Sequence, residues 1–245
     1  MNVLEVEGLR KVYPAFELKN VSFTVPEGAI MGFIGRNGAG KSTTLKSILG
    51  LVHPDGGLVR WCGENVKTCE KTFKENIGVV LGGVDFYPKK KLRMITDVTK
   101  KFYPNWDEGK YQHYCKLFSL DSDKRVDQLS SGMRIKYLIA LALSHSARLL
   151  ILDEPTSGLD PVSRDELVTL FRSIVADGTR SILFSTHITS DLEKCASHIA
   201  FIKDGAIVRT GTVEEFMAFY SDKGTTLEDI IISVERRELD EGAIV

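Results

Sequence analysis

The sequence has no long apolar run, little net charge and no signal-peptide pattern. No apolar run approaches the roughly 18–20 residues that cross a membrane, and the amino-terminus has neither the basic nor the apolar region of a signal peptide. The 32 basic and 33 acidic residues nearly cancel. The charge balance therefore does not indicate a nucleic acid or an anionic surface as a partner. Any role at a membrane would depend on a partner protein.

The cysteines are few and scattered. They lie at Cys62, Cys69, Cys115 and Cys195, and no two form a C-x-x-C pair. In a chain of 245 residues this pattern is typical of reduced thiols and a cytosolic protein. The same length allows one large α/β domain or two small ones. No internal repeat divides it.

A glycine-rich stretch, Gly35–Thr43, follows an apolar run at residues 29–34 and precedes a stretch with helical spacing. Its order fits G-x-x-x-x-G-K-[ST] between a strand and a helix, which predicts a phosphate-binding loop. Glycines let several backbone N–H groups turn toward one phosphate chain, and the start of the helix adds partial positive charge. The residues expected to bind are Gly35, Arg36, Asn37, Gly38, Ala39, Gly40, Lys41, Ser42 and Thr43.

Two side chains of this loop have separate expected roles. Lys41 can bridge the outer phosphates as a flexible point charge. The Ser42 hydroxyl suits Mg²⁺, because this small hard cation takes oxygen ligands. The alternative interpretation is a glycine turn between a strand and a helix that binds no ligand.

Two acids, Asp153 and Glu154, follow the apolar run at residues 149–152. Such a run predicts a buried strand, and its carboxyl end is the edge at which ligands bind in parallel sheets. We expect Asp153 to hold Mg²⁺ together with Ser42, and Glu154 to polarise an attacking water. His187 ends a second apolar run and is expected to contact the γ-phosphate. The alternative is that these are ordinary surface groups at strand ends.

The rest of the chain predicts a helical insert in a β/α core. Two stretches between residues 3 and 25 alternate as strands with one buried face. From residue 82 to about residue 127 the spacing becomes helical and lysine-rich. An aromatic cluster in this insert forms either its own small core or a docking surface for a partner. The cluster consists of Phe102, Tyr103 and Trp106.

Two further motifs distinguish this chain among phosphate-loop proteins. Residues 129–133 read Leu-Ser-Ser-Gly-Met, and residues 153–160 read Asp-Glu-Pro-Thr-Ser-Gly-Leu-Asp. They are similar to the LSGGQ signature and to the Walker B and D-loop sequence of ATP-binding cassette (ABC) transporters. His187 matches the switch histidine of that family, and Tyr13 lies where the family has an aromatic that stacks on adenine. Over residues 3–220 the chain resembles the nucleotide-binding subunit of an ABC transporter, of the exporter type.

The resemblance implies an α/β fold, with a P-loop NTPase (RecA-like) core, an antiparallel β subdomain and a helical insert. Residues 1–233 would form the nucleotide-binding domain, and residues 234–245 a charged C-terminal tail. Within the domain, residues 1–82 and 147–220 would form the ATP-binding core and the β subdomain. Residues 83–146 would form the helical subdomain with the signature.

The resemblance also implies a site that two chains share. In the family, two cassettes pack head to tail, and each ATP with its Mg²⁺ lies between the phosphate loop of one subunit and the signature of the other. The catalytic residues would be Glu154, His187 and Lys41. The residues facing the opposite protomer's ATP would be Ser130, Ser131, Gly132 and Met133. The D-loop would consist of Ser157, Gly158, Leu159 and Asp160.

The implied partners are a second, identical or paired cassette and multi-span membrane subunits. The chain would then be a peripheral protein at the cytoplasmic face of the cell membrane. No nucleic acid is expected. Tyr13, taken alone, is equally consistent with ligand stacking and with plain surface packing.

The sequence departs from the family pattern at two places. The family usually has a glutamine where this chain has Gly82, so the usual side-chain oxygen for Mg²⁺ or water is missing unless Asp85 or a water replaces it. The signature has Ser131 for the first glycine and Met133 for the glutamine, but it keeps Gly132. We expect ATP hydrolysis to survive, because the phosphate-loop and carboxylate residues are all present.

Three functions are consistent with these residues. The first is the ATPase of a membrane exporter. Residues 102–107 and 138–145 resemble segments of proteins that export amphipathic peptides, either antimicrobial peptides or peptides of the phenol-soluble modulin type. The second is a soluble ATPase of the same superfamily without a membrane partner. The third, suggested by Gly82, is a switch that dimerises on ATP without turnover. We predict the first, and the cargo would be chosen by the membrane subunit.

Overall fold

Five parallel strands and one antiparallel strand form the central sheet of the computed structural model, which describes residues 1–81 and 87–236. The strand order is β10-β9-β3-β8-β7-β6. The strands are β3 (Ile30–Ile34), β6 (Ile77–Val80), β7 (Leu149–Asp153), β8 (Ser181–Thr186), β9 (His198–Lys203) and β10 (Ala206–Thr212). Every residue of β3, β7 and β8 is buried, as expected of parallel strands that are covered on both faces. Gly82 and Asp85 lie outside the described residues.

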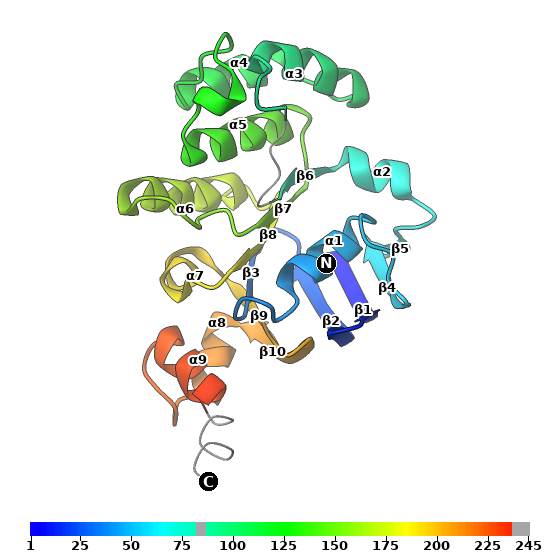
Figure 1. Ribbon diagram of the computed structural model, residues 1–245, viewed down its shortest axis with the longest axis vertical. Helices are drawn as coiled ribbons and strands as arrows, with labels where there is room; N and C mark the ends of the chain where they lie inside the picture. Colours follow the sequence, from blue (N-terminus) through cyan, green and yellow to red (C-terminus); the bar gives the residue numbers. More distant parts are fainter. Residues whose placement is uncertain (82–86, 237–245) are drawn as a thin grey trace.

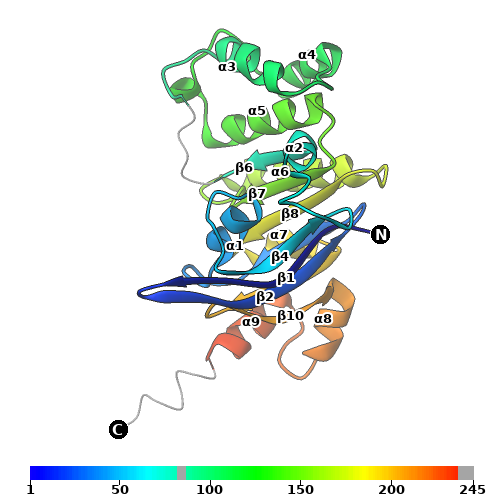
Figure 2. The same cartoon turned by 90° about the vertical axis from the view of Figure 1, so that its right-hand side faces the viewer.

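The amino-terminal residues form a second sheet, in which every pairing is antiparallel. Its strands are β1 (Asn2–Tyr13), β2 (Phe16–Pro26), β4 (Gly56–Trp61) and β5 (Glu64–Asn65), in the order β2-β1-β4-β5. Figure 2 shows β1 and β2 as a long hairpin across one side of the molecule. The predicted antiparallel β subdomain is therefore confirmed.

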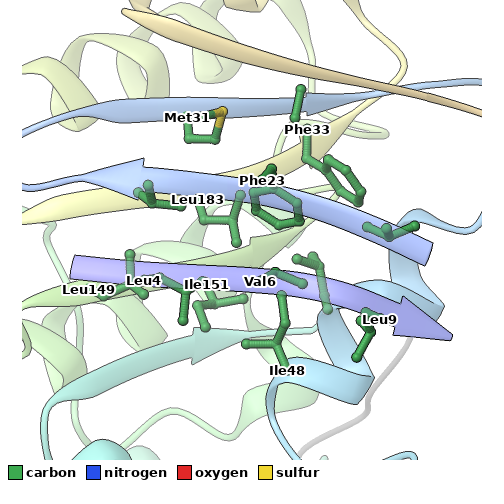
Figure 3. Close-up of a cluster of buried hydrophobic side chains, with 14 of the residues drawn as sticks. Leu4, Val6, Leu9, Phe23, Met31, Phe33, Ile48, Leu149, Ile151 and Leu183 are labelled. Atoms are coloured by element: carbon green, nitrogen blue, oxygen red, sulfur yellow. The ribbon is translucent and has the colours of Figure 1, made fainter. Parts of the chain in front are cut away.

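Alternate residues of the central strands point into two separate cores. In β7, Leu149 and Ile151 pack with side chains of the antiparallel sheet and of α1 (Lys41–Ile48). Figure 3 shows this core, with Leu183 of β8 beside them. Leu150 and Leu152 face the opposite way, toward the helices on the other face. Because both faces are covered, the carboxyl ends of the strands are held at fixed positions.

A helical region lies at one end of the molecule, as predicted (Figure 1). Its elements are α3 (Leu92–Thr99), η1 (Lys100–Phe102), α4 (Glu108–Leu117), η2 (Val126–Gln128) and α5 (Ser131–Ser144). The α3, α4, η2 and α5 helices share a third core, in which the Thr96 hydroxyl donates to Tyr111 Oη at 2.9 Å. Trp106 packs against this core, whereas Phe102 is 71% exposed. The aromatic residues therefore do not form the single cluster that we predicted.

The remaining helices surround the central sheet. They are α2 (Glu70–Glu75), α6 (Pro161–Val175), α7 (Thr189–Cys195), α8 (Val213–Phe219) and α9 (Leu227–Arg236). Buried residues of α6 and α7, such as Phe171 and Leu192, pack against the face opposite α1. The α9 helix continues through residues 233 and 234, and Lys203 Nζ donates to Val234 O at 3.3 Å. Within the two described ranges, no helix combines the length and apolarity needed to cross a membrane.

Candidate functional site

The glycine-rich loop connects the carboxyl end of β3 to the start of α1. A side chain at Gly35 would place its Cβ 2.3 Å from the Ile202 carbonyl oxygen. Gly40 has φ +111° and caps α1, and a Cβ there would lie 2.6 Å from Leu18 Cδ2. Both positions therefore require glycine, and the loop backbone is free to approach a ligand. The first N–H groups of α1 follow directly and favour an anion.

Lys41 is the first residue of α1 and is only 5% exposed. Its Nζ donates to Gly35 O at 2.7 Å and to Arg36 O at 3.2 Å. It also lies 3.0 Å from Glu154 Oε1. The contact with Glu154 is a pairing of charges rather than an aligned hydrogen bond, because Oε1 is buried without a hydrogen-bond partner. The ammonium group is thus held over the loop instead of moving freely.

Three hydroxyl and carboxylate groups meet beside this lysine. Ser42 Oγ donates to Asp153 Oδ1 at 3.1 Å, and Ser185 Oγ donates to the same oxygen at 2.6 Å. Asp153 ends β7 and is 5% exposed. Ser42 and Asp153 therefore present hard oxygens on adjacent elements, which is the donor chemistry that Mg²⁺ prefers. These residues fit such an ion.

Glu154 has a backbone conformation that is unusual for its residue type. Its φ is +51°, in the left-handed region. Its N–H donates to Ser185 Oγ at 3.0 Å and to Ser185 O at 3.2 Å. Its Oε2 lies 2.8 Å from His187 Nδ1. The carboxylate therefore lies between the predicted phosphate-contacting lysine and histidine.

The predicted signature residues lie apart from this group, at the start of α5. Ser130 caps the helix and accepts a hydrogen bond from the Met133 N–H at 3.2 Å. Ser130 and Ser131 are exposed. A Cβ at Gly132 would lie 3.7 Å from Leu159 Cδ2, so the signature and the D-loop are neighbours within one chain.

The predicted D-loop leads from Asp153 and Glu154 into α6. Ser157 N–H donates to Glu154 O at 3.2 Å, Gly158 has φ +72° and Leu159 is buried. Asp160 caps α6 by accepting from the Val162 and Ser163 N–H groups, each at 3.0 Å. Lys136 of α5 pairs with Glu166 of α6 at 2.6 Å, which further joins the two helices. Contacts within the chain thus link the signature, through the D-loop, to Glu154, which follows Asp153 at the end of β7.

Tyr13 lies at the end of β1, opposite Phe16 in the hairpin. Its side chain is 39% exposed, and Lys11 Nζ lies 5.6 Å from the ring centroid. Sequence reasoning did not identify Ser185 as a site residue. The only sequence signal was its place near the end of an apolar run, which many structural serines share.

Comparison with known proteins identifies the family. The ABC transporter model matches residues 18–157. The ATP-binding protein YtrB of Bacillus subtilis is 30% identical over 83% of this chain and 69% of its own length. The bacitracin transport protein BcrA of Bacillus licheniformis is 32% identical, covering 84% of this chain and 68% of BcrA. The Nod factor export protein I of Burkholderia lata is 34% identical, covering 79% and 65%. The chain therefore spans about two thirds of these relatives.

Solved structures agree on the fold. An ATP-binding subunit of an ABC transporter is 27% identical with a TM-score of 0.84, over 95% of this chain and 99% of that one. A dimeric ATP-binding cassette in a post-hydrolysis state, bound to ADP and Pi, has a TM-score of 0.75 over 86% and 98%. Its identity is 21%, so it supports the fold alone.

Proposed function

Because this chain belongs to the ABC transporter family as an ATP-binding, ATP-hydrolysing subunit, we propose that it hydrolyses ATP in a site shared with a second cassette and thereby powers peptide export. The observation that carries the proposal is the convergence of Lys41, Glu154 and His187 at the carboxyl ends of the central strands. Lys41 Nζ and His187 Nδ1 lie 3.0 Å and 2.8 Å from the two oxygens of one carboxylate. The signature faces solvent on a neighbouring helix.

Each residue of this group has a defined part. The phosphate loop and Lys41 bind and orient the phosphate chain. Ser42 and Asp153 would hold Mg²⁺, which neutralises developing charge when bound. Glu154 accepts a proton from the attacking water, and His187 fixes the orientation of that carboxylate and reaches the γ-phosphate. Both carboxylate oxygens have a cationic or polar partner, so Glu154 is held for this task before ATP arrives.

The second cassette would supply the other half of the site. The exposed start of α5 offers Ser130, the Gly132 N–H and a helix N-terminus to a phosphate that arrives from outside the chain. The D-loop connects that surface to Glu154. Hydrolysis would remove the shared anion and loosen the dimer, and this opening would drive membrane-spanning partner subunits. The chain would then be held at the cytoplasmic face of the membrane by those subunits.

The proposed cargo is an amphipathic or antimicrobial peptide. Support comes from the likeness to a protein of bacitracin transport and from the resemblance of residues 102–107 and 138–145 to peptide exporters. The competing function is a soluble ATPase without a membrane partner. Purification from native membranes in detergent separates the two, since only the exporter would retain a multi-span membrane protein.

The replacement Glu154→Gln tests the shared site. We expect ATP turnover to fall by about a hundredfold or more, because the base is lost while the size of the side chain is kept. We also expect a dimer that persists in ATP, measured by size-exclusion chromatography. The exposed Glu214→Gln is the matched control and should hydrolyse ATP at the unmodified rate. Unchanged turnover in Glu154→Gln would contradict the proposal and favour a switch without hydrolysis.

A further inference from the structure

Ser185 contacts both acids of the proposed catalytic group. It is fully buried near the end of β8 and pairs in register with Asp153 of β7. Its hydroxyl donates to Asp153 Oδ1 at 2.6 Å and accepts from the Glu154 N–H at 3.0 Å. One hydroxyl group thus connects the side chain of the first acid to the main chain of the second.

The backbone at Glu154 explains why such a connection matters. In a regular strand, successive side chains point to opposite faces of the sheet. If β7 continued in this way, Asp153 and Glu154 could not both approach the phosphate loop. The left-handed φ of +51° at Glu154 breaks the alternation at that residue. The break brings the Glu154 carboxylate to Lys41, on the same side as the contact between Asp153 and Ser42.

A glutamate rarely adopts this conformation without support. Part of the support comes from one neighbouring residue, because the Glu154 N–H donates both to Ser185 Oγ at 3.0 Å and to Ser185 O at 3.2 Å; the Ser157 N–H also donates to Glu154 O. The main-chain bond would survive any substitution at Ser185, but the side-chain bond would not. The hydroxyl is also oriented, since it donates to Asp153 and accepts from Glu154.

We propose that Ser185 is a positioning residue for ATP hydrolysis: its hydroxyl holds Glu154 in the left-handed conformation that aims its carboxylate at the attacking water, and it orients Asp153 at the same time. Ser185 can have this role only if Glu154 is the base of the shared site. Loss of the hydroxyl should slow the chemical step and leave ATP binding to the phosphate loop.

The same strand provides a matched control in Ser181. It is also fully buried on β8, and its hydroxyl also makes two hydrogen bonds. It accepts from the Gly28 N–H at 3.0 Å and donates to Pro26 O at 3.2 Å. It lies at the opposite end of the strand from the catalytic group. Ser181→Ala therefore reproduces the loss of a buried, doubly bonded serine hydroxyl without touching the site.

The test compares the unmodified chain with Ser185→Ala, Ser181→Ala and Glu154→Gln. Steady-state turnover and size-exclusion chromatography are measured with MgATP. For Ser185→Ala we expect kcat to fall about tenfold or more while KM for ATP changes less than about threefold. We also expect an ATP-bound dimer that persists as in Glu154→Gln. Ser181→Ala should keep kcat within about twofold and form no persistent dimer.

Dimer persistence separates positioning from a general loss of structure. A damaged fold lowers turnover by weakening the ATP-bound dimer, whereas a misaimed base lowers turnover and prolongs that dimer. The inference is overturned if Ser185→Ala turns over normally, if it loses turnover without a persistent dimer, or if Ser181→Ala behaves in the same way. If Ser185→Ala does not fold, Ser185→Cys, which has a similar shape but bonds weakly, must show the same slow turnover and persistent dimer. Failure of Glu154→Gln to trap a dimer would instead overturn the shared site itself.

Discussion

Protonation of His145 should destabilise the fold in mildly acidic solution. His145 follows α5, is 3% exposed, and stacks on Tyr103 with ring centroids 3.7 Å apart. The imidazole Nδ1 is buried without a hydrogen-bond partner. Burial lowers the pKa of His145 from 6.5 to about 4. A proton on Nδ1 would add both a charge and an unmatched N–H to an apolar site.

The sign of the effect follows from the two pKa values. In the unfolded chain the imidazole takes up a proton near pH 6.5, whereas in the folded chain it does so only near pH 4. The unfolded state therefore binds more protons in this window, and stability is present above pH 6.5 and lost as the pH falls toward 4. The full difference amounts to about 3 kcal/mol, of which about 2 kcal/mol is lost between pH 7.5 and pH 5.

Urea unfolding at pH 7.5 and pH 5.0 measures this loss. The informative variant is His145→Phe, which keeps a ring on Tyr103 but cannot titrate. Over this interval the unmodified chain should lose about 2 kcal/mol more than the variant. Burial also lowers the pKa of His198, but His198 is present in both proteins and its contribution cancels in the comparison.

Equal losses in the two proteins would refute the reasoning. Such a result would mean that the imidazole is already protonated in the folded state at pH 5, so that the stack on Tyr103 does not exclude the charge. Carboxylates do not obscure the comparison, because most Asp and Glu side chains remain ionised in both states down to about pH 5.

Two further predictions concern packing and capping. Gly78→Ala would bring a Cβ within 2.3 Å of Ala142 Cβ and 2.5 Å of Leu150 Cδ2, and we expect urea unfolding to show a loss of about 1–3 kcal/mol as β6 and α5 are forced apart. Unchanged stability would mean that this interface can relax. Asp160→Ala removes the acceptor for the first N–H groups of α6, and the unfolding free energy should fall by about 1 kcal/mol. Asp160→Asn should retain most of that unfolding free energy, because an amide oxygen can also cap the helix. An equal loss of unfolding free energy in the two variants would argue against capping.

The phosphate loop could be predicted from the sequence because its characteristic residues are nearly consecutive. Gly35, Gly40 and Lys41 stand at the spacing of the motif, although the contacts that require the two glycines come from Ile202 and Leu18 of distant strands. The apolar runs identified the buried central strands for the same reason, since continuous burial leaves little freedom in residue type. Both the glycine-rich motif and the apolar strands can be identified from a few consecutive residues.

The contacts of the aromatic residues in the insert could not be predicted in this way. Phe102, Tyr103 and Trp106 are close in sequence, yet Trp106 joins the helical core, Tyr103 stacks on His145 and Phe102 is exposed. Periodicity predicts a helix, but it does not say which neighbouring element each ring meets. The partner of Tyr103 is about forty residues away along the chain, where no local pattern connects the two.

The direction of the Glu154 side chain could not be predicted from the sequence either. Two adjacent acids after an apolar run predict two functional carboxylates, but a strand would direct them to opposite faces. The conflict is resolved by one left-handed residue and by the parallel register that sets Ser185 beside Asp153. Ser185 lies 31 residues from Glu154, so its support for the left-handed conformation exists only after β7 and β8 have paired. A motif can therefore identify the two acids, while the sheet determines where the second acid points.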